Sequence, residues 1–371
     1  MAKKRTILIC GNYGAGNFGD ELILEGLLKP LRTFPYTNIY ITSRYPHGEG
    51  KFCPFAPSSF RSFIRSLFTG NLIRLIIILF KTDLILFGGG CLFNEGEPAS
   101  IRIWYSHFFF FRLFRKKIII IGQSFSPMRE RDNQKKLRTI INGALRIFVR
   151  DSSSRRYLDS LKTQAHISVL PDSAFFLEYH ETTHSLLKSE REKNLLLISL
   201  RSWPDIDEEE LITKIEQLSR ELYGKYFIKS QIVVLQTGRN SDNEISNKLY
   251  KKIEQYSEAP PIAWMNLKNM EALYQRAAIN LSMRLHGAIF GITQEVPTRA
   301  INYDPKVENL LTEIGLTNLL IQKSDDILQK TKNLLQQGEI SSASQSRKIH
   351  SLASRAIEYK KFLTKVLNSI K

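Results

Sequence analysis

The stretch TILICGNYGAGNFGDE, residues 6–21, runs from an apolar segment through a glycine-rich loop into a pair of acidic residues. A short apolar run that ends in glycines is typical of a buried parallel strand followed by a loop that faces a ligand. Asp20 and Glu21 come directly after the last glycine, where they would cap a helix at the positive end of its dipole. The stretch therefore predicts a strand over 6–10, a loop over 11–19 and then a helix.

The same rhythm of apolar runs and helical patterns continues through most of the chain. The runs in the first half lie at 6–10, 38–42, 83–90, 117–125, 146–151 and 167–172, and those in the second half at 194–202, 231–239, 277–286 and 296–304. Strands that alternate with helices predict parallel sheets. We therefore expect an α/β fold of two Rossmann-like, doubly wound domains facing a cleft, an arrangement that resembles the GT-B class of glycosyltransferases.

The length of 371 residues favours two domains. The segment 177–193 is polar and has no strand pattern, so it is the best linker candidate. We expect an N-terminal domain over 1–176, a C-terminal domain over 194–340 and a basic amphipathic helix over 341–371. This last helix is expected to pack back over a domain.

Charge is unevenly distributed along the chain. The net charge is +17; residues 1–175 hold 26 Lys/Arg and 12 Asp/Glu (+14), and residues 176–371 hold 27 and 24 (+3). A basic field attracts nucleic acid, anionic lipid or phosphorylated small molecules. Because no nucleic-acid-binding motif accompanies it, we expect no nucleic-acid partner.

The segment 101–117 mixes five basic residues with seven aromatic ones. Two interpretations remain open for it: a crossover helix buried against the sheet, or a helix lying on an anionic membrane surface. Residues 71–90 are interrupted by charges, so no membrane-spanning helix is expected.

The N-terminus shows no secretory signal, and the three cysteines contain no CxxC pair, so the sequence predicts a cytoplasmic location, with peripheral contact at the inner membrane face as an option. HETTH at 180–184 matches the HExxH zinc motif, but it lies in the linker candidate and has no evident third ligand. No metal site is expected.

Gly14, Gly16 and Gly19 match GxGxxG, the dinucleotide fingerprint. In that fingerprint the first glycine directly follows the strand, whereas Gly14 arrives late, and an acidic pair occupies the helix end that a pyrophosphate would use. We therefore expect a substrate-facing loop, with Asn12 and Asn17 directed at the ligand.

Seven segments in order resemble the polysaccharide pyruvyl transferase family, specifically its bacterial branch that acts on cell-wall polysaccharide. They are GNYGAGNFGDE (11–21), FGGGCLF (87–93), VRD with SSRRYL (149–158), PDSAF (171–175), SLRSW (199–203), SMRLHGAIF (282–290) and INYDPKV (301–307). Cys91 and Gly287 depart from the common pattern of the family, but neither affects a charged group. The resemblance covers roughly residues 5–320.

The resemblance implies transfer of pyruvate from phosphoenolpyruvate onto two hydroxyls of one sugar, with formation of a ketal and without a metal or other cofactor. The acceptor is expected to be a sugar or lipid-linked glycan, held by the N-terminal domain, with the donor on the C-terminal domain. A donor with a carboxylate and a phosphate requires arginines, and proton transfer near neutral pH suits histidine. We therefore expect His286 as acid/base, together with Arg284 and Arg150, as the catalytic set.

Substrate-binding positions follow from the same motifs. They are Asn12, Gly14, Gly16, Asn17, Asp20, Gly89, Gly90, Arg201, Leu285, Tyr303, Asp304 and Lys306. Asp20, Asp172 and Asp304 are also suited to helix capping, and both readings stay open for each. Two other functions remain open as well: a GT-B glycosyltransferase that uses a nucleotide-sugar donor, and a non-catalytic glycan-binding or envelope-assembly protein.

Overall fold

The chain forms two α/β units in the computed structural model, which describes residues 5–34, 37–43, 51–95, 100–177, 193–238 and 241–369. The first unit comprises Met1–Ala15, Ile23–Phe176 and Ser354–Lys371, and the second comprises Gly16–Leu22 and Leu177–Ala353. Each unit is built on one parallel sheet, which confirms the predicted α/β class with two doubly wound sheets.

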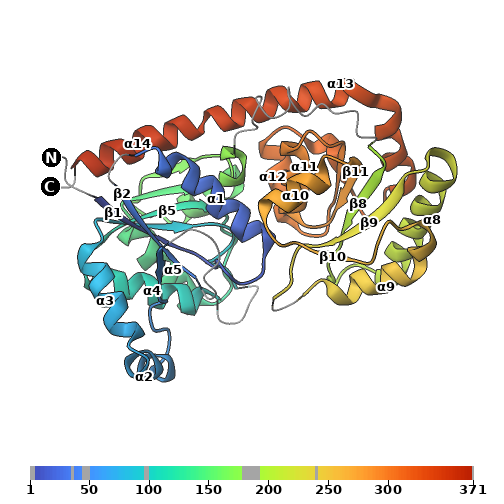
Figure 1. The fold of residues 1–371 in the computed structure, drawn as a ribbon. Helices are drawn as coiled ribbons and strands as arrows, with labels where there is room; N and C mark the ends of the chain where they lie inside the picture. Colours follow the sequence, from blue (N-terminus) through green and yellow to red (C-terminus); the bar gives the residue numbers. More distant parts are fainter. Residues whose placement is uncertain are drawn as a thin grey trace. The chain divides into compact units, whose positions relative to one another are not determined.

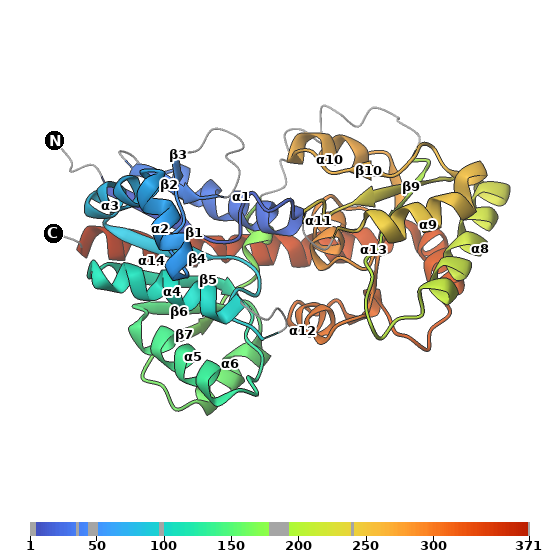
Figure 2. The same cartoon turned by 90° about the horizontal axis from the view of Figure 1, so that it is seen from below.

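In the described part of the first unit, seven parallel strands follow the order β3-β2-β1-β4-β5-β6-β7 (Figures 1 and 2). The strands are β1 (Arg5–Cys10), β2 (Thr37–Thr42), β3 (Lys51–Cys53), β4 (Leu84–Gly88), β5 (Lys117–Gln123), β6 (Arg146–Val149) and β7 (Ile167–Val169). The helices are α1 (Phe18–Arg32, which begins in the second unit), α2 (Phe60–Phe68), α3 (Asn71–Lys81), α4 (Ser100–Leu113), α5 (Arg131–Gly143), α6 (Ser152–Ser160), the 3-10 turn η1 (Ser173–Phe176) and α14 (Ala356–Ser369).

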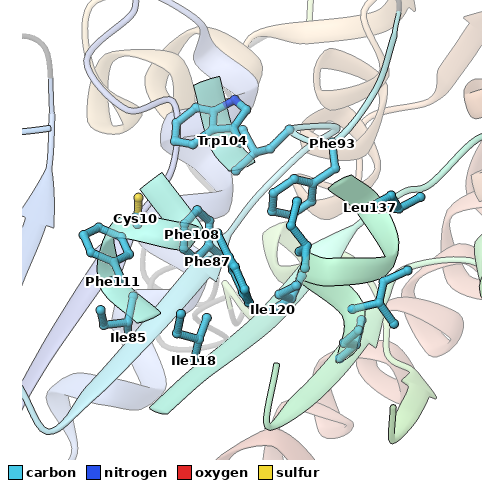
Figure 3. Close-up of a cluster of buried hydrophobic side chains, with 14 of the residues drawn as sticks. Cys10, Ile85, Phe87, Phe93, Trp104, Phe108, Phe111, Ile118, Ile120 and Leu137 are labelled. Carbon is cyan, nitrogen blue, oxygen red and sulfur yellow. The ribbon is translucent and has the colours of Figure 1, made fainter. Parts of the chain in front are cut away.

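Both faces of the first sheet are buried, which is why its strands read as continuous apolar runs. Leu8 and Ile120 face a core shared with α3, α4, α5 and α6, whereas Ile9 and Ile121 face a second core formed with α1 and α14. Figure 3 shows the first of these cores, in which aromatic rings from α4 lie over the strands.

Helix α4 contains most of the aromatic and basic segment 101–117, for which two interpretations were open. Trp104, Phe108 and Phe111 of this helix are buried in the first core, beside Phe87 of β4. The interpretation of 101–117 as a crossover helix packed against the sheet is therefore the one that the structure supports.

The second unit has six parallel strands among its described residues, in the order β10-β9-β8-β11-β12-β13. Figure 1 labels β8, β9, β10 and β11. They are β8 (Leu195–Ser199), β9 (Lys229–Val234), β10 (Ile262–Ala263), β11 (Ala277–Ser282), β12 (Thr298–Ile301) and β13 (Leu320–Ile321). The helices are α8 (Glu208–Tyr226), α9 (Asn243–Ile253), η2 (Glu254–Tyr256), α10 (Leu267–Tyr274), α11 (Leu285–Thr293), α12 (Pro305–Glu313), η3 (Thr317–Leu319) and α13 (Ile327–Ser354).

Each sheet contains one point at which the strand order reverses: between β1 and β4 in the first unit, and between β8 and β11 in the second. In open α/β sheets, ligands bind beyond the carboxyl ends of the strands at this point. The glycine loop follows β1, and Arg284 follows β11, so the topology puts predicted site residues at both positions.

Two segments group differently from the predicted domains. Gly16–Leu22 belongs to the second unit, because its backbone is hydrogen-bonded to the loop after β9. The single helix expected over 341–371 is instead the end of α13 followed by α14, whose Tyr359 and Leu363 pack in the core of the first unit. Most of the expected linker, residues 178–192 with HETTH, lies outside the described residues.

Candidate functional site

The carboxyl ends of four neighbouring strands in the second unit gather charged and aromatic side chains. Arg201 follows β8, Asp242 follows β9, Arg284 and His286 follow β11, and Tyr303 follows β12. Because parallel strands end at the same edge of a sheet, these side chains share one side of the unit.

Arg284 is held by a two-point ion pair with Asp242. Its Nε donates to Asp242 Oδ2 at 2.9 Å, and its Nη2 donates to Oδ1 of the same carboxylate. Asp242 Oδ2 also accepts from the backbone N–H of Gln236 at 3.2 Å. The pair fixes the plane and direction of the Arg284 guanidinium at the strand ends.

Burial raises the pKa of Asp242 above its usual 3.8, although Arg284 and then Arg201 act in the opposite direction. The Coulombic effect of Arg201 means that two guanidinium groups lie close to one carboxylate. Two guanidinium groups therefore act on the single Asp242 carboxylate, an arrangement that suits an anionic ligand.

Arg201 belongs to an aromatic and cationic cluster with Trp203, Tyr303 and Lys306, called here the Arg201 cluster. The Arg201 guanidinium lies 4.8 Å from the Trp203 ring centre and 5.1 Å from that of Tyr303, and its Nη1 donates to Tyr303 Oη at 3.2 Å. Lys306 Nζ lies 5.7 Å and 5.3 Å from the same two rings. The rings hold the Arg201 guanidinium in place without neutralising it, whereas Lys306 is also paired with Asp304.

The second half of the glycine loop lies beside these strand ends. The carbonyl of Gly16 accepts from the backbone N–H of Thr237 at 2.8 Å and from Trp264 Nε1 at 3.3 Å. The backbone N–H of Phe18 donates to the carbonyl of Leu235 at 2.9 Å. These bonds fix the second half of the loop against the strand ends of the second unit.

His286 lies directly against Gly19, the third glycine of the GxGxxG match. A Cβ at position 19 would lie 2.3 Å from His286 Nδ1 and 2.7 Å from its Cγ. Real Cβ atoms do not approach so closely, so only glycine leaves room for the imidazole where it stands. The glycine that suggested a dinucleotide site instead makes space for the predicted acid/base.

We expect Gly19→Ala to lower turnover by about 100-fold, because a displacement of about 1 Å at a reacting group is enough for such a loss. The free energy of unfolding should change little, because alanine is favoured over glycine in a helix by about 1 kcal/mol and this gain offsets the cost of moving the imidazole. Steady-state kinetics and urea unfolding of the variant check both expectations. Gly224→Ala in α8 is the matched control, since nothing lies within 4 Å of its Cβ position; wild-type turnover in Gly19→Ala would contradict the role given to this glycine.

Asn17 caps α1, a role that the sequence had given to Asp20. Asn17 Oδ1 accepts from the backbone N–H groups of Gly19 at 2.8 Å and Asp20 at 3.3 Å. Asp20 and Glu21 lie in the first helical turn, near the positive end of the dipole as expected. The Asn17 side-chain oxygen is thus used for the cap, and contact of Asn17 with a ligand stays a prediction.

Asp304 also caps a helix. It is the N-cap of α12, accepts from the backbone N–H of Lys306 at 2.9 Å and is followed by Pro305 at the first helical position. Its Oδ2 lies 3.3 Å from Lys306 Nζ, so the carboxylate also holds the lysine beside the rings of the Arg201 cluster. Leu285 is the first residue of α11 and is buried, which makes it a packing residue.

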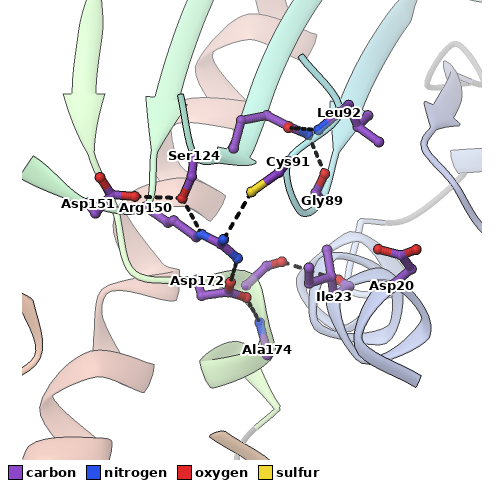
Figure 4. Close-up of polar contacts among 12 residues, drawn as sticks. Asp20, Ile23, Gly89, Cys91, Leu92, Ser124, Arg150, Asp151, Asp172 and Ala174 are labelled. Carbon is purple, nitrogen blue, oxygen red and sulfur yellow. Dashed lines mark hydrogen bonds and ion pairs between the residues drawn. The ribbon is translucent and has the colours of Figure 1, made fainter. Parts of the chain in front are cut away.

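Arg150, predicted in the first unit, lies among polar contacts with Cys91, Ser124 and Asp172 (Figure 4). The Arg150 side chain is 2% exposed and pairs with Asp172, which is fully buried, at 2.9 Å. Its Nε donates to Ser124 Oγ at 2.5 Å, and its Nη2 lies 3.4 Å from Cys91 Sγ. Burial opposes the charge of Arg150, but Cys91 and Asp172 outweigh this effect, so its pKa is raised.

Asp172 therefore balances the buried arginine, and its Oδ1 also accepts from the backbone N–H of Ala174 at 3.0 Å. Gly89 and Gly90, with φ of 90° and 70°, form the turn after β4. This turn is held by Gln123, whose side chain donates to the carbonyl of Gly89 and accepts from the N–H of Leu92. Asn12 and Gly14 lie in the part of the glycine loop that belongs to the first unit.

Asp151, next to Arg150, caps α6. Its carboxylate accepts from the Ser154 backbone N–H at 2.7 Å and from the hydroxyls of Ser124 and Ser153 at 2.6 Å each. Burial alone raises the pKa of Asp151, but these hydrogen bonds outweigh it, so the pKa lies below its usual 3.8.

Asp151→Asn should lower the free energy of unfolding by about 1–3 kcal/mol at neutral pH, because an amide accepts these bonds poorly. A lowered folded-state pKa stabilises the protein above the unfolded-state pKa, and that stabilisation is lost as the pH falls through the folded-state value. The difference between parent and variant should therefore shrink below about pH 4. Urea unfolding across pH checks this, with the exposed Asp159→Asn as control; a difference that does not vary with pH would refute it.

Asp242 and Trp203 were not among the residues predicted for the site. An aspartate at the start of a helix is read as a cap, yet Asp242 makes no side-chain cap bond to α9. Trp203 stood in the quoted SLRSW segment, and its place beside an arginine after a strand was the available signal. Among the described residues, no group of three or more His, Cys, Asp or Glu is placed to hold a metal ion.

Solved structures share this architecture at low sequence identity. The chain is similar to a glycosyltransferase from Rickettsia africae ESF-5, with 15% identity and a TM-score of 0.60 over 99% of this chain and 100% of that one. It is also similar to Anabaena HepE in complex with UDP and glucose, with 12% identity and a TM-score of 0.60 over 98% of this chain and 99% of that one. A third similar structure is UDP-GlcNAc 2-epimerase from Neisseria meningitidis bound to UDP-GlcNAc, with 11% identity and a TM-score of 0.59 over 98% of this chain and 99% of that one. At these identities the likeness shows the fold alone.

The family model for polysaccharide pyruvyl transferase matches residues 17–305. The match runs from Asn17, the cap of α1, to Pro305, the first residue of α12, and it includes the Arg284–Asp242 pair, His286 and Arg150. It spans more than half of the chain, and the chain therefore belongs to the polysaccharide pyruvyl transferase family.

Proposed function

We propose that the protein transfers pyruvate from phosphoenolpyruvate onto a sugar of a cell-envelope polysaccharide, or of its lipid-linked precursor, and forms a ketal. Family membership supports pyruvyl transfer to a polysaccharide. The observation that carries the choice of donor is the combination of Arg201, Arg284 and Lys306 with His286 at the strand ends of the second unit.

Phosphoenolpyruvate suits this edge because it carries two anionic groups on one small skeleton. Arg284 is fixed by Asp242, and Arg201 is fixed by two aromatic rings, so both guanidinium groups are oriented before a ligand binds. Preorganised, poorly solvated cations bind carboxylate and phosphate better than flexible ones do. Lys306 is a third cation beside the same rings and is paired with Asp304, so the three cations outnumber Asp242 and Asp304 by one.

The proposed chemistry begins with a proton on His286. The imidazolium gives this proton to the methylene carbon of the donor, and the central carbon becomes oxocarbenium-like. One sugar hydroxyl adds to that carbon, and its proton returns to His286. His286 gives this proton to the bridging oxygen as the carbon–oxygen bond breaks and inorganic phosphate leaves. The second hydroxyl then adds to the central carbon, and its proton returns to His286. Atoms and charge balance with one histidine, so the proposal assigns no metal or resident cofactor.

Arg150 takes a positioning role in this proposal. All three of its guanidinium nitrogens are engaged inside the first unit. Through Cys91, Ser124 and Asp172, Arg150 joins the loops that follow β4, β5 and β7 to its own position after β6. These loops include Gly89 and Gly90. The assignment of the acceptor to the N-terminal domain stays a prediction, as does a cytoplasmic location.

The main rival is a glycosyltransferase with a nucleotide-sugar donor. It is favoured by the fold, since two of the similar structures hold UDP or a UDP-sugar. A non-catalytic glycan-binding protein is the other alternative; turnover excludes it.

Binding measurements separate the two donors. We expect calorimetric titration to detect phosphoenolpyruvate and not UDP-sugars, and we expect Arg201→Gln to weaken phosphoenolpyruvate binding about tenfold or more, as loss of a charge-assisted hydrogen bond does. Lys268→Gln, an exposed change on α10, is the control. Binding of UDP-sugars without phosphoenolpyruvate would favour the rival.

A further inference from the structure

Helix α2 presents an apolar stripe that no described part of the chain covers. Phe60, Phe63, Ile64, Leu67 and Phe68 recur at the spacing that places residues on one face of a helix. No residue of α2 is buried, and Phe60 and Phe68 are 81% and 86% exposed. Figure 1 shows α2 projecting from the first unit beyond α3. A soluble protein rarely leaves so many large apolar side chains together in water without a partner.

Helix α3 continues this surface and ties it to the core. The chain turns at Gly70, where φ is 69°, and the two helices are bent by 90°. One face of α3 is buried through Leu75 and Leu79, whereas Ile73, Ile77 and Phe80 on the other face are exposed. The exposed face of α3 therefore belongs to a helix whose other face is packed in the core of the first unit.

All charged residues of α2 and α3 are basic. Between Glu49 and Asp83 the chain holds no acidic residue, and the basic residues of the two helices, Arg61, Arg65, Arg74 and Lys81, are all exposed. Aromatic and aliphatic side chains bordered by arginines are the chemistry of a helix that lies at a lipid headgroup boundary. A second copy of the chain would bring like charges together at this surface.

We infer that α2 and the exposed face of α3 form a docking surface for a lipid bilayer with anionic headgroups. In the described ranges no single helix is long and apolar enough to cross a membrane; α2 and α3 reach that standard only as a bent pair. Because α3 has one face in the protein core, the pair lies on the bilayer. The inference does not depend on the proposed chemistry, although such docking would bring the enzyme to lipid-linked acceptors.

Vesicle sedimentation of the full chain tests the inference. We expect the protein to sediment with vesicles of equal parts phosphatidylglycerol and phosphatidylcholine at low salt, and much less with phosphatidylcholine alone. Phe60→Ser with Phe68→Ser should weaken binding at least about tenfold, since two buried aromatic side chains are lost from the lipid. Arg61→Gln with Arg65→Gln should weaken binding and reduce its salt dependence.

The control is Phe227→Ser with Met265→Ser, which removes two apolar side chains that are 77% and 72% exposed in the second unit. It should bind vesicles like the parent. Because α2 buries no residue, the tested changes should leave the unfolding midpoint unchanged. Absence of sedimentation with anionic vesicles, parent-like binding by the Phe60/Phe68 variant, or a dimer in solution that this variant dissociates would overturn the inference, whatever the outcome of turnover assays.

Discussion

Replacement of His286 by alanine is expected to lower turnover by about 10²- to 10⁴-fold, the usual contribution of a general acid/base. In the proposed reaction the same imidazole gives one proton to carbon and one to the leaving phosphate, and it accepts protons from two hydroxyls, so every step depends on it. His286 lies in the first turn of α11, half-buried against Gly19, and its removal leaves a gap beside a glycine and not in the apolar core. Stability should therefore change little.

Phosphate release under single-turnover conditions measures this loss, and thermal unfolding checks that the variant is folded. His350→Ala, at an exposed position of α13, is the matched control and should keep full activity. If His286→Ala turns over as fast as the parent protein, the proposed mechanism is wrong.

Replacement of Arg150 by methionine should have the largest effect on stability. The change leaves Asp172 fully buried without its cation, and breaking a buried ion pair from one side typically costs about 3–5 kcal/mol. Removing both charges, with Arg150→Met and Asp172→Leu together, should recover much of that loss, because an apolar pair of similar volume often replaces a buried ion pair at no net cost.

Urea unfolding of the two single variants and the double variant measures the coupling. An Arg150→Met variant within about 1 kcal/mol of the parent would show that the pair is not structurally important. The double variant also tests the catalytic role predicted for Arg150: if it binds phosphoenolpyruvate like the parent, Arg150 does not contact the donor.

The parallel strands were predictable because their signal is local. Buried strands such as β1 and β5 are short runs of Ile and Leu bounded by glycine or polar residues, and each such run corresponds to a strand. The missed strands, β3, β10 and β13, are edge strands of two or three residues. So short a strand is specified by its neighbour in the sheet and leaves no pattern in the sequence.

Contacts between side chains that lie far apart in the sequence were harder to predict. The sequence placed Arg284 and His286 after a strand, but it gave no sign that Asp242, more than forty residues earlier, holds the arginine. The cap formed by Asn17 was likewise not predicted, because it depends on the positions of the Gly19 and Asp20 backbone N–H groups. The packing of α14 on the first unit likewise follows from contacts with strands far away in the chain.

The central claim is tested most directly by incubating the protein with phosphoenolpyruvate and a panel of lipid-linked disaccharides, with phosphate release and product mass followed together. The account predicts phosphate release that requires an acceptor, and a product whose added mass is that of a pyruvate ketal. Release of UDP from a nucleotide sugar, with phosphoenolpyruvate left unused in the presence of every acceptor, would contradict it.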